Sequence, residues 1–472
     1  MYRFSGKSQC SFATCVTGKG TVDFQMTRGF RAAVSAKDDR IRVLAISPRF
    51  APTNGADTHR LRLLLPHASA AGWSAEVLCV RPEDAAVSPD PWLETSLPNN
   101  VVVHRVRAPR LGIWGMNGLA QRAILGLYLR GAGLLGSGRF DLVFFSTTEF
   151  ATHLLGPLWL KRFRVPFCMD FQDPWVNDFY RHHPDVTPPG GRIKYGIADA
   201  IHRASERYVL GECSGYMSVS ATYRDDVVSR HGSPVNDRPW LIRPFPAEPA
   251  EMDRGACCQP CQGRQRGQTS QKVWRYVGRG GEDMARAARA FFMAWSEAMA
   301  LELVPQDGIR FEAYGTSYAT RGTPEKTLEP LAARTRVESF VKEWPGRLGY
   351  REATTALRNS DALVVFGSED SSYTASKIYP YLLAQRPLLA IFHERSSVVS
   401  LMAKVGGGVC VTFNEGTSSH DLAAAILKAW FESGHFAAAV RLDRAALEPY
   451  TAAVQATEVG HWFREILADA HH

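Results

Sequence analysis

The sequence predicts an α/β protein made of two doubly wound domains, each a parallel sheet covered by helices on both faces. Short apolar runs of strand length alternate with longer segments of helical period, which is the pattern of a parallel sheet with crossover helices. This alternation occurs twice along 472 residues, and a chain of that length exceeds one ordinary hydrophobic core. We therefore expect a central cleft lined by the carboxyl ends of both sheets.

The expected domain boundaries follow changes in composition. Residues 1–40 lack a hydrophobic segment, which indicates a disordered or loosely packed tail rather than a secretory signal. The first domain spans 41–243. Residues 244–271 are rich in Pro, Gly, Gln and Cys and predict a linker or an exposed excursion. The second domain spans 272–450, and 451–472 predicts a C-terminal helix for which the first domain is the expected packing partner.

The first domain opens with an apolar strand, Ile41–Ile46, and a loop that contains Asn54 and Gly55. A glycine at this position lets the backbone approach a ligand closely. Further strands are predicted at Ala75–Val80, Val101–Arg105, Asp141–Phe145, Val165–Asp170, Gly215–Val219 and Trp240–Ile242, and helices at Leu119–Leu135, Ala151–Arg162, Ile197–Glu212 and Ala221–His231.

The second domain opens with a strand, Lys272–Val277, that leads into a glycine-rich turn and a helix. The turn, Gly278–Gly281, permits close backbone approach, and Arg279 supplies a forked cation suited to a diphosphate. The spacing fits neither the dinucleotide GxGxxG motif nor a Walker A loop, so an ordinary glycine turn with an exposed arginine is the alternative. Further strands are predicted at Ile309–Ala313, Val337–Val341, Ala362–Phe366, Leu388–Phe392 and Gly408–Val411.

A polar loop, Gly367–Tyr373, follows one of these strands, and a helix is predicted to begin at about Thr374. Ser376 and Lys377 would then lie in its first turn. A cation there opposes the helix dipole at a cost of ~0.3–1 kcal/mol unless an anion lies nearby. This pattern predicts a phosphate site made by Lys377 and the backbone N–H groups of the turn. A lysine that extends to solvent is the alternative.

Composition narrows the class of protein further. The net charge of +8 favours anionic partners, but the basic residues are mostly dispersed and no nucleic-acid motif is present. Nine cysteines without regular spacing indicate a reducing compartment. Cys257, Cys258 and Cys261 resemble half a zinc knuckle without a second pair, so a plain linker is favoured over a metal site. No apolar run reaches the ~18 residues needed to span a bilayer, and we expect a cytoplasmic protein, peripheral at most to the inner face of the membrane.

Residues 368–392, SEDSSYTASKIYPYLLAQRPLLAIF, resemble the donor-binding segment of family-4-type retaining glycosyltransferases of the GT-B fold. YVGR at Tyr276–Arg279 is similar to the strand-to-loop motif of this family. Ser47–Leu61 is similar to its N-terminal glycine loop, and Val219–Gly232 to the segment that ends its first domain. The resemblance covers about residues 41–430.

This resemblance implies two Rossmann-like domains, a nucleotide-sugar donor bound on the second, and retention of the anomeric configuration. It implies neither a metal nor another cofactor, because fixed cations would neutralise the diphosphate. Pro380 stands where the family usually has a glutamate credited with holding the donor ribose. The first acidic residue of the family's paired-glutamate motif has no exact counterpart, since Glu369 or Asp370 lies a few residues early, and Glu369 is the candidate catalytic carboxylate on this side. The expected donor-binding residues are Arg279, Gly280, Tyr373, Thr374, Ser376 and Lys377.

The first domain offers candidates for catalysis and for the acceptor. Asp173, in the segment DFQDPW after a strand, is the second catalytic candidate because it could orient an acceptor hydroxyl. Trp175 could stack on a sugar face, although an Asp-Pro turn with a core tryptophan is an equal alternative. The other expected acceptor-binding residues are Asn54, Gly55 and Glu149.

Residues 95–140 contain no acidic side chain but six arginines with interleaved apolar residues. Such a surface suits an anionic membrane or a lipid-phosphate acceptor, whereas a solvated basic face over a buried helix is the alternative. The arginines are Arg105, Arg107, Arg110, Arg122, Arg130 and Arg139.

These observations lead to one principal hypothesis, a glycosyltransferase that moves a sugar from a nucleotide-diphosphate donor to a glycan, lipid-linked or small-molecule acceptor. Two alternatives remain. One is a nucleotide-sugar epimerase of the same fold, and the other is a non-catalytic nucleotide-sugar-binding member of a polysaccharide assembly system. A nicotinamide dehydrogenase is disfavoured because neither domain has the dinucleotide motif.

Overall fold

The computed structural model describes residues 40–85, 87–110, 118–176, 178, 181, 191–254, 271–317, 325–370 and 376–470. The predicted tail therefore lies outside the described residues except for Arg40. The cysteines at 257, 258 and 261 and the candidate donor-binding residues Tyr373 and Thr374 lie outside them too.

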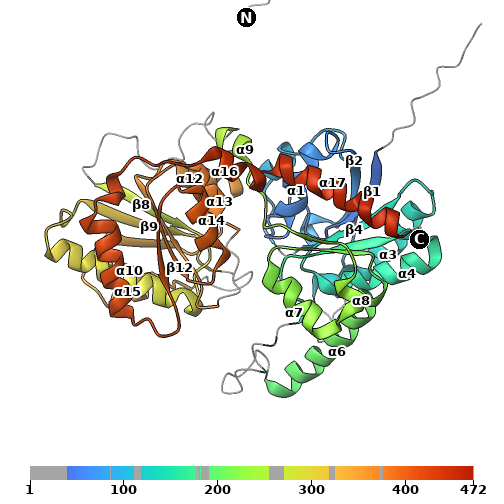
Figure 1. Ribbon diagram of the computed structural model, residues 1–472, viewed down its shortest axis with the longest axis horizontal. Helices are drawn as coiled ribbons and strands as arrows, with labels where there is room; N and C mark the ends of the chain where they lie inside the picture. The colour runs from blue at the N-terminus through green and yellow to red at the C-terminus, as the bar shows by residue number, and fades with distance from the viewer. Residues whose placement is uncertain are drawn as a thin grey trace, which may run out of the picture. The chain divides into compact units, whose positions relative to one another are not determined.

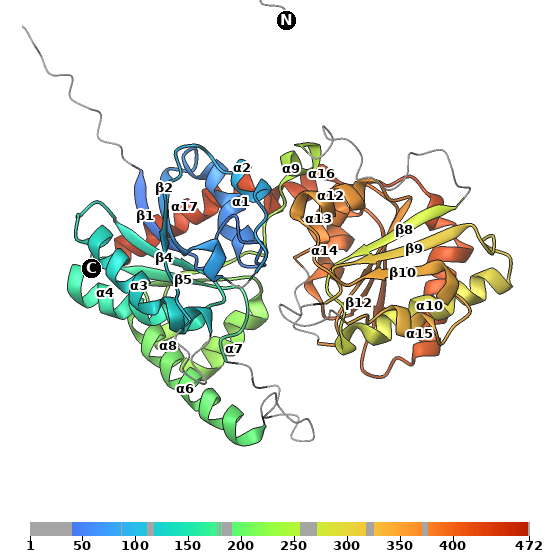
Figure 2. The same ribbon diagram turned by 180° about the vertical axis from the view of Figure 1, so that it is seen from behind.

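The first sheet has seven parallel strands in the order β3-β2-β1-β4-β5-β6-β7. Helices cover both of its faces (Figures 1 and 2). The strands are β1 Ile41–Ile46, β2 Trp73–Val80, β3 Val103–Val106, β4 Leu142–Ser146, β5 Phe167–Phe171, β6 Gly215–Ser218 and β7 Trp240–Ile242. The helices are α1 Thr58–Ala68, α2 Trp92–Thr95, α3 Leu119–Leu135, α4 Leu155–Phe163, α6 Arg192–Glu212, α7 Ala221–His231 and α8 Ser233–Asn236, with short turns η1 Pro82–Asp84 and η2 Phe150–Leu154.

The second sheet has six parallel strands in the order β10-β9-β8-β11-β12-β13. Its strands are β8 Lys272–Val277, β9 Ile309–Tyr314, β10 Val341–Trp344, β11 Ala362–Phe366, β12 Leu388–His393 and β13 Val409–Phe413. Its helices are α10 Ala285–Ala300, α11 Glu329–Ala332, α12 Tyr350–Arg358, α13 Ile378–Leu383, α14 Ser397–Val405, α15 Ser419–Ile426 and α16 Arg444–Leu447. Short turns are η4 Glu282–Met284, η5 Glu338–Phe340, η6 Leu427–Glu432, η7 His435–Ala437 and η8 Glu448–Tyr450.

Two parallel sheets, each covered by helices, confirm the predicted α/β class. The strand order reverses between β1 and β4 in the first sheet and between β8 and β11 in the second. Open α/β sheets bind ligands in the crevices at such reversals, because the connections leave the sheet in opposite directions there. The loops after β1, β8 and β11 therefore lie where a site is expected.

The connection between the sheets differs from the predicted exposed linker. Its first part contains helix α9, Pro249–Arg254, whereas residues 255–270 lie outside the described residues. Glu251 is buried and forms an ion pair with buried Arg62 of α1, while Met252 joins the core of the second sheet. The connection therefore begins with a packed segment, which composition alone did not indicate.

The last helix, α17 Ala452–Asp469, packs on the first sheet. Phe463 makes edge-to-face contacts with Trp73 and Phe144, both at 5.5 Å between ring centroids. A Cβ at Gly460 would lie 2.5 Å from the carbonyl oxygen of Ala71, so glycine is what allows the helix to approach this closely.

The chain thus passes between the two sheets twice, and the two passing segments are hydrogen-bonded to each other. The Ala247 N–H donates to the carbonyl of Tyr450, and the Ala452 N–H donates to the carbonyl of Ala247, both at 2.8 Å. These bonds form a short parallel bridge between Ala247 and Thr451. No helix in the described part of the chain has the length and apolar character needed to cross a bilayer.

Candidate active site

Close packing requires glycine at two positions of the turn after β8. A Cβ at Gly278 would lie 2.6 Å from the Nζ atom of Lys377, and a Cβ at Gly280 would overlap the Oγ1 atom of Thr327. Neither position accommodates a side chain unless its neighbour moves. The turn therefore brings backbone directly against the side chain of Lys377, as a binding loop requires.

Lys377 packs against the end of β8 and is half-buried. Its amine donates to the Tyr276 hydroxyl at 2.5 Å and lies 4.5 Å from the centre of the Tyr276 ring. Desolvation, followed by the nearby positive charge of Arg279, lowers the pKa of Lys377 to about 7. An amine held in this way gains its proton most readily when an anion binds beside it.

Arg279 is fixed in orientation by Asp283. Its two terminal nitrogens donate to the two carboxylate oxygens of Asp283 at 2.8 and 2.5 Å. Burial acts to raise the pKa of Asp283, but the hydrogen bonds from Arg279 and Ser368 outweigh it and leave this pKa below its ordinary value. The guanidinium therefore stays charged and oriented at the turn.

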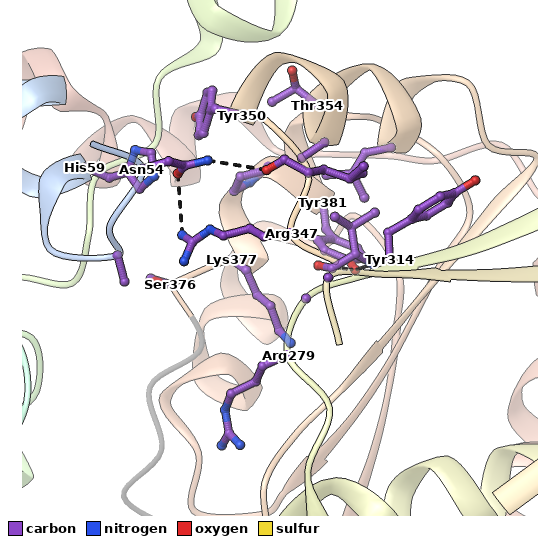
Figure 3. Close-up of a pocket in the computed structure, with 18 of the residues that line it drawn as sticks. Asn54, His59, Arg279, Tyr314, Arg347, Tyr350, Thr354, Ser376, Lys377 and Tyr381 are labelled. Carbon is purple, nitrogen blue, oxygen red and sulfur yellow. Dashed lines mark hydrogen bonds between the residues drawn. The ribbon is translucent and has the colours of Figure 1, made fainter. Parts of the chain in front are cut away.

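A cavity of about 280 Å³ lies beside these two cations and is lined by residues of both domains. Arg279 and Lys377 lie together at one end, while Asn54, His59 and Tyr350 lie at the other (Figure 3). The remaining walls are largely apolar, and they include Leu63, Phe245, Val277, Tyr314, Leu348, Ala353, Leu357 and Tyr381.

A buried arginine of α1 holds the connecting segment where that segment lines the cavity. Arg60 donates to the carbonyls of Pro244 and Arg243 at 2.7 and 2.9 Å, and it pairs with Asp170 at 3.1 Å. Its guanidinium also lies 4.8 Å from the centre of the Phe245 ring. Phe245 is therefore held in the cavity wall by contacts with the first domain.

Sequence reasoning missed the loop after β10, which contributes Arg347 and Leu348 to the cavity, and Tyr350, the first residue of α12. Asn54 donates to the Leu348 carbonyl at 3.3 Å, and Arg347 donates to the Asn54 side-chain oxygen at 3.5 Å. The Tyr350 N–H donates to the Asp90 carboxylate at 2.6 Å. The available signal was the glycine pair in PGRLG after a strand, which is the same kind of pattern as the turn after β8.

His59 was also missed, since a single histidine on a helix gives no distinctive spacing. Its ring centroid lies 4.9 Å from that of Tyr350. Burial, together with the charges of Arg62 and Arg347, lowers the pKa of His59 well below its ordinary value. His59 is therefore a neutral hydrogen-bonding group in the cavity wall at neutral pH.

Asp173 lies outside the cavity lining but within electrostatic reach of Arg279. Although its side chain is exposed, desolvation by the surrounding protein and the charge of Asp57 raise its pKa to about 6, against the opposing effect of Arg279. Asp57 in turn accepts a hydrogen bond from Thr147 at 3.1 Å and lies 3.6 Å from Arg49. A carboxyl with a pKa near 6 can exchange a proton close to neutral pH.

Glu369 lies in a different cavity from Lys377. It pairs with Arg286 at 3.0 Å and lines a polar cavity of about 450 Å³ together with Arg289. Its backbone N–H donates to the carbonyl of Asp283 at 2.7 Å, which connects its loop to the turn that holds Arg279. The structure therefore places Glu369 near the predicted diphosphate site but not in its cavity.

Of the acceptor candidates, Asn54 lines the cavity whereas Gly55, Glu149 and Trp175 do not. Gly55 lies in the loop after β1, where an added Cβ would lie 2.7 Å from the Asp57 carboxylate. Its small size is therefore needed by its neighbours in the first domain.

Glu149 and Trp175 have packing and hydrogen-bonding contacts within the first domain. Glu149 pairs with Arg49 and accepts from the Ala120 N–H at the start of α3, the latter at 3.0 Å. Trp175 is only 6% exposed, stacks on Phe150 and donates from its indole nitrogen to His202. The core-tryptophan alternative therefore describes Trp175 better than the sugar-stacking one.

The helix expected to begin at about Thr374 begins later. Helix α13 is Ile378–Leu383, and Lys377 precedes its first turn. Six helical residues give a weak dipole, and residues 371–375 lie outside the described ranges. Ser376 and Lys377 do line the cavity, so packing against β8 rather than a helix terminus brings them to Arg279.

The predicted basic surface of residues 95–140 is corrected in part. Arg122 is buried and donates to the carbonyls of Ala108 and Asp84, so it cannot belong to a surface. Arg105 pairs with Glu94 and Arg139 with Glu76. The exposed arginines that remain are Arg105, Arg107, Arg110, Arg130 and Arg139, and membrane contact through this segment stays a prediction.

Within the described ranges, no group of three or more His, Cys, Asp or Glu side chains is arranged to hold a metal ion.

Comparison with known proteins supports the resemblance found in the sequence. Residues 55–238 match the model of the glycosyl transferase 4-like domain, which corresponds to most of the first domain. No curated protein sequence matches the chain.

Solved structures extend the likeness to the second domain. The HepE protein of Anabaena in complex with UDP and glucose has a TM-score of 0.55 at 13% identity, with 89% of this chain and 98% of that chain covered. The α,α-trehalose 6-phosphate synthase of Burkholderia multivorans has a TM-score of 0.57 at 13% identity, with 92% and 100% covered. The fold is GT-B.

A third similar structure is the glycosyltransferase of Rickettsia africae, with a TM-score of 0.56 at 11% identity, with 91% of this chain and 99% of that chain covered. In this GT-B chain, Arg279 and Lys377 lie beside the strand-order reversal of the second sheet. Identities this low show the fold alone, because one fold supports many different activities.

Proposed function

We propose that the protein is a nucleotide-sugar-dependent glycosyltransferase. The observation that carries the proposal is the pair of cations, Arg279 and Lys377, at one end of a largely apolar cavity beside a glycine turn. A nucleoside diphosphate has a ring system that suits apolar walls and two phosphates that suit adjacent cations. The UDP and UDP-glucose complexes of the Anabaena protein add support for a nucleotide-sugar donor.

Arg279 and Lys377 would bind the donor diphosphate and stabilise it as the leaving group. Negative charge grows on the diphosphate as its bond to the sugar breaks, and fixed cations in a partly dry site stabilise that charge effectively. Because desolvation has lowered the pKa of Lys377, the arriving diphosphate would restore its proton. These two groups would do the work that a divalent metal does in other transferases.

Asp173 would orient the acceptor hydroxyl and receive its proton. Its carboxyl, with a pKa of about 6, belongs to the first domain and is influenced by Arg279 of the second. A glycan or lipid-linked acceptor would bind on the first domain. Retention of the anomeric configuration is proposed on the strength of the resemblance to retaining enzymes.

A screen of nucleotide-diphosphate sugars by thermal shift would find the donor, because a ligand at 100 times its Kd adds about 2.7 kcal/mol to stability. With that donor, Lys377→Ala and Arg279→Ala should each lower transfer by about a hundredfold or more. Lys342→Ala and Arg334→Ala, which remove exposed cations outside the cavity, are the matched controls.

Two outcomes would contradict the proposal. One is full activity in both Lys377→Ala and Arg279→Ala, and the other is the absence of any stabilising nucleotide sugar. The anomeric configuration of the product, read by proton NMR, tests retention separately.

A further inference from the structure

Over most of helix α6, Arg192–Glu212, the distribution of polar and apolar side chains is inverted, and apolar side chains are buried only near its end, at Val209 and Leu210. A surface helix normally buries its apolar face and exposes its polar one. In α6 the residues Ile193, Ile197 and Ile201, spaced four apart along one face, are 83%, 61% and 60% exposed. Asp199 and Glu206 are buried instead. This arrangement costs free energy in water unless the apolar face is covered by something else.

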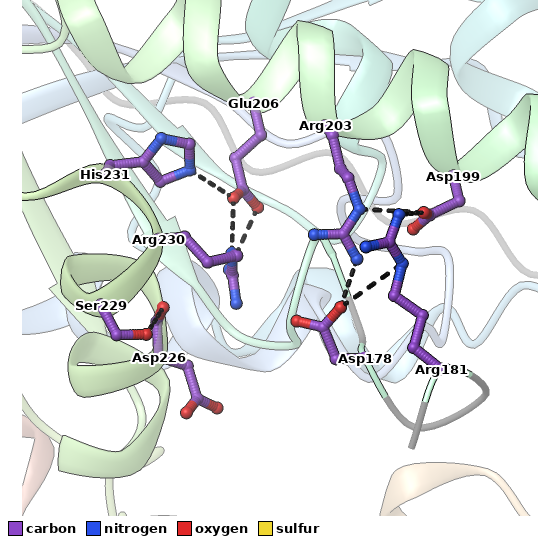
Figure 4. A network of polar contacts seen from close by, with 9 residues as sticks. All are labelled: Asp178, Arg181, Asp199, Arg203, Glu206, Asp226, Ser229, Arg230 and His231. Carbon is purple, nitrogen blue, oxygen red and sulfur yellow. Dashed lines mark hydrogen bonds and ion pairs between the residues drawn. The ribbon is translucent and has the colours of Figure 1, made fainter. Parts of the chain in front are cut away.

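The buried charge at the middle of α6 is held in place by ion pairs. Asp199 accepts from Arg203 at 2.9 Å and from Arg181 at 3.1 Å, and Arg203 also pairs with Asp178 (Figure 4). The contacts with Arg181 and Asp178, which lie outside the helix, oppose rotation of the helix about its axis.

Glu206 has the same role about two turns further along the helix. It accepts from Arg230 at 3.1 Å and from His231 at 2.7 Å, both on α7 (Figure 4). The helix cannot turn its isoleucines inward without breaking both groups of ion pairs. Their exposure is therefore built into the fold of the domain.

Two neighbouring helices also have large exposed apolar side chains. Helix α4 packs beside both α3 and α6, through Arg162 to the Tyr128 hydroxyl at 3.2 Å and through Lys161 to the Tyr208 hydroxyl at 3.4 Å. Most of the large exposed apolar side chains among the described residues lie on these three helices. They are Leu125, Leu129, Leu158, Ile193, Ile197, Ile201 and Tyr208.

The charge on these three helices is strongly one-sided. The sequences of α3 and α4 contain no acidic residue, and in α6 the acidic side chain that is exposed is Glu212. The exposed basic side chains are Arg130, Lys161, Arg162, Arg192, Lys194 and Arg207. An apolar strip flanked by cations is complementary to a surface that has negative charge above an apolar interior.

We propose that the face formed by α3, α4 and α6 docks on an anionic lipid bilayer, with the isoleucines of α6 inserted at the level of the headgroups. A second copy of the chain fits this face poorly, because a symmetric contact would bring the same cations together. The bilayer satisfies both the apolar strip and its basic flanks. Docking of this kind does not depend on the proposed function, since it requires no transfer reaction.

Flotation of the full chain with lipid vesicles tests the proposal. Wild type should float with vesicles that contain phosphatidylglycerol, should stay behind with pure phosphatidylcholine, and should lose binding as salt rises. Ile197→Ser/Ile201→Ser should lower the partition coefficient about tenfold or more. The control Leu301→Ser/Leu303→Ser, which removes exposed apolar side chains of the second domain, should float like wild type.

A charge variant, Arg162→Glu/Arg207→Glu, should lower the partition coefficient and flatten its salt dependence. Circular dichroism and thermal unfolding establish that the variants are folded. The proposal is overturned if wild type does not float with anionic vesicles, or if the isoleucine variant floats equally well. It is also overturned if sedimentation velocity shows self-association of wild type that the isoleucine variant abolishes, because the face would then bind a second copy.

Discussion

Lys377 and Arg279 are two basic side chains at one end of a single cavity. Their surroundings stabilise the positive charge of one and disfavour that of the other. Arg279 is held by the carboxylate of Asp283, whereas the Lys377 amine has a pKa of about 7. The protonated amine is therefore unfavourable in the folded protein without an anion. This is a residue-scale reason to expect the site to respond to pH.

Lys377 should make the ligand-free protein more stable as pH rises. The folded pKa of about 7 lies below the ordinary value of 10.5, so between these values the unfolded chain binds the extra proton. Stability then increases with pH across that window. The free energy of unfolding, measured in urea, should be roughly 1 kcal/mol higher at pH 9 than at pH 7, and Lys377→Met should lack this difference. The difference is smaller than the full pKa shift implies, because solvent still reaches the side chain. Equal pH dependence in both proteins would contradict the assignment.

Asp173→Asn should separate binding from chemistry. The amide cannot accept the proton of an acceptor hydroxyl, so we expect kcat to fall about a hundredfold or more while donor affinity is kept. The raised pKa of about 6 predicts that kcat/KM in wild type declines below pH 6, since the base becomes protonated. Unchanged kcat in the variant would remove Asp173 from the mechanism.

The predictability of the site depended on whether its signal was local in sequence. Arg279 and Lys377 stood out because one lies in a glycine turn and the other occupies an unfavourable position after a loop. His59 and Tyr350 had no such local sequence signal, because they line the cavity only after α1 and α12 are brought together. The roles of the candidate catalytic residues in both domains stay predictions.

At the scale of elements, the buried strands were the most predictable parts of the chain. The predicted bounds of β1, β8 and β11 agree with the structure, since each strand is bounded by a clear change in polarity. The edge strand β10 was placed too early. It alternates buried and exposed residues, and its buried Glu343 accepts from the Leu328 and Glu329 N–H groups at 2.8 Å. A buried carboxylate that caps another helix has no apolar signature.

Gly280→Ala should destabilise the turn after β8. The added methyl group would overlap the Thr327 hydroxyl, so the turn or the loop that holds Thr327 must shift at a cost of about 1–3 kcal/mol. Gly346→Ala is the matched control, since no atom lies within 4 Å of its added Cβ. Denaturant unfolding measures both. A similar loss of stability in the two variants would show that the contact with Thr327 does not matter.

The ion pair between Arg62 and Glu251 tests the packing of α9 on α1. Both side chains are almost fully buried, so Glu251→Ala would leave an uncompensated guanidinium and should cost about 3–5 kcal/mol. The double variant Arg62→Met/Glu251→Leu should recover much of this loss, because no buried charge then remains. If Glu251→Ala were neutral by urea unfolding, residues 244–254 would be the loose linker that composition suggested.

At the scale of the whole molecule, α17 makes the first domain dependent on a segment that follows the second domain in sequence. A chain ended at Thr451 would expose Trp73 and Phe144, which α17 covers. We expect such a protein to lose protection from hydrogen exchange in β1 and β2 while β8 and β11 stay protected. A chain ended at Ala470 is the control. Unchanged protection of β1 in the shorter protein would contradict this dependence.

The short bridge between Ala247 and Thr451 constrains how the two domains can move. A single flexible tether permits rotation about any axis, whereas two strands bonded side by side bend easily in only one direction. We expect relative motion to be concentrated at this bridge, where both backbones would have to change their dihedral angles together. Opening and closing of the cavity would therefore follow one repeatable path, so that its two walls meet in the same alignment each time it closes.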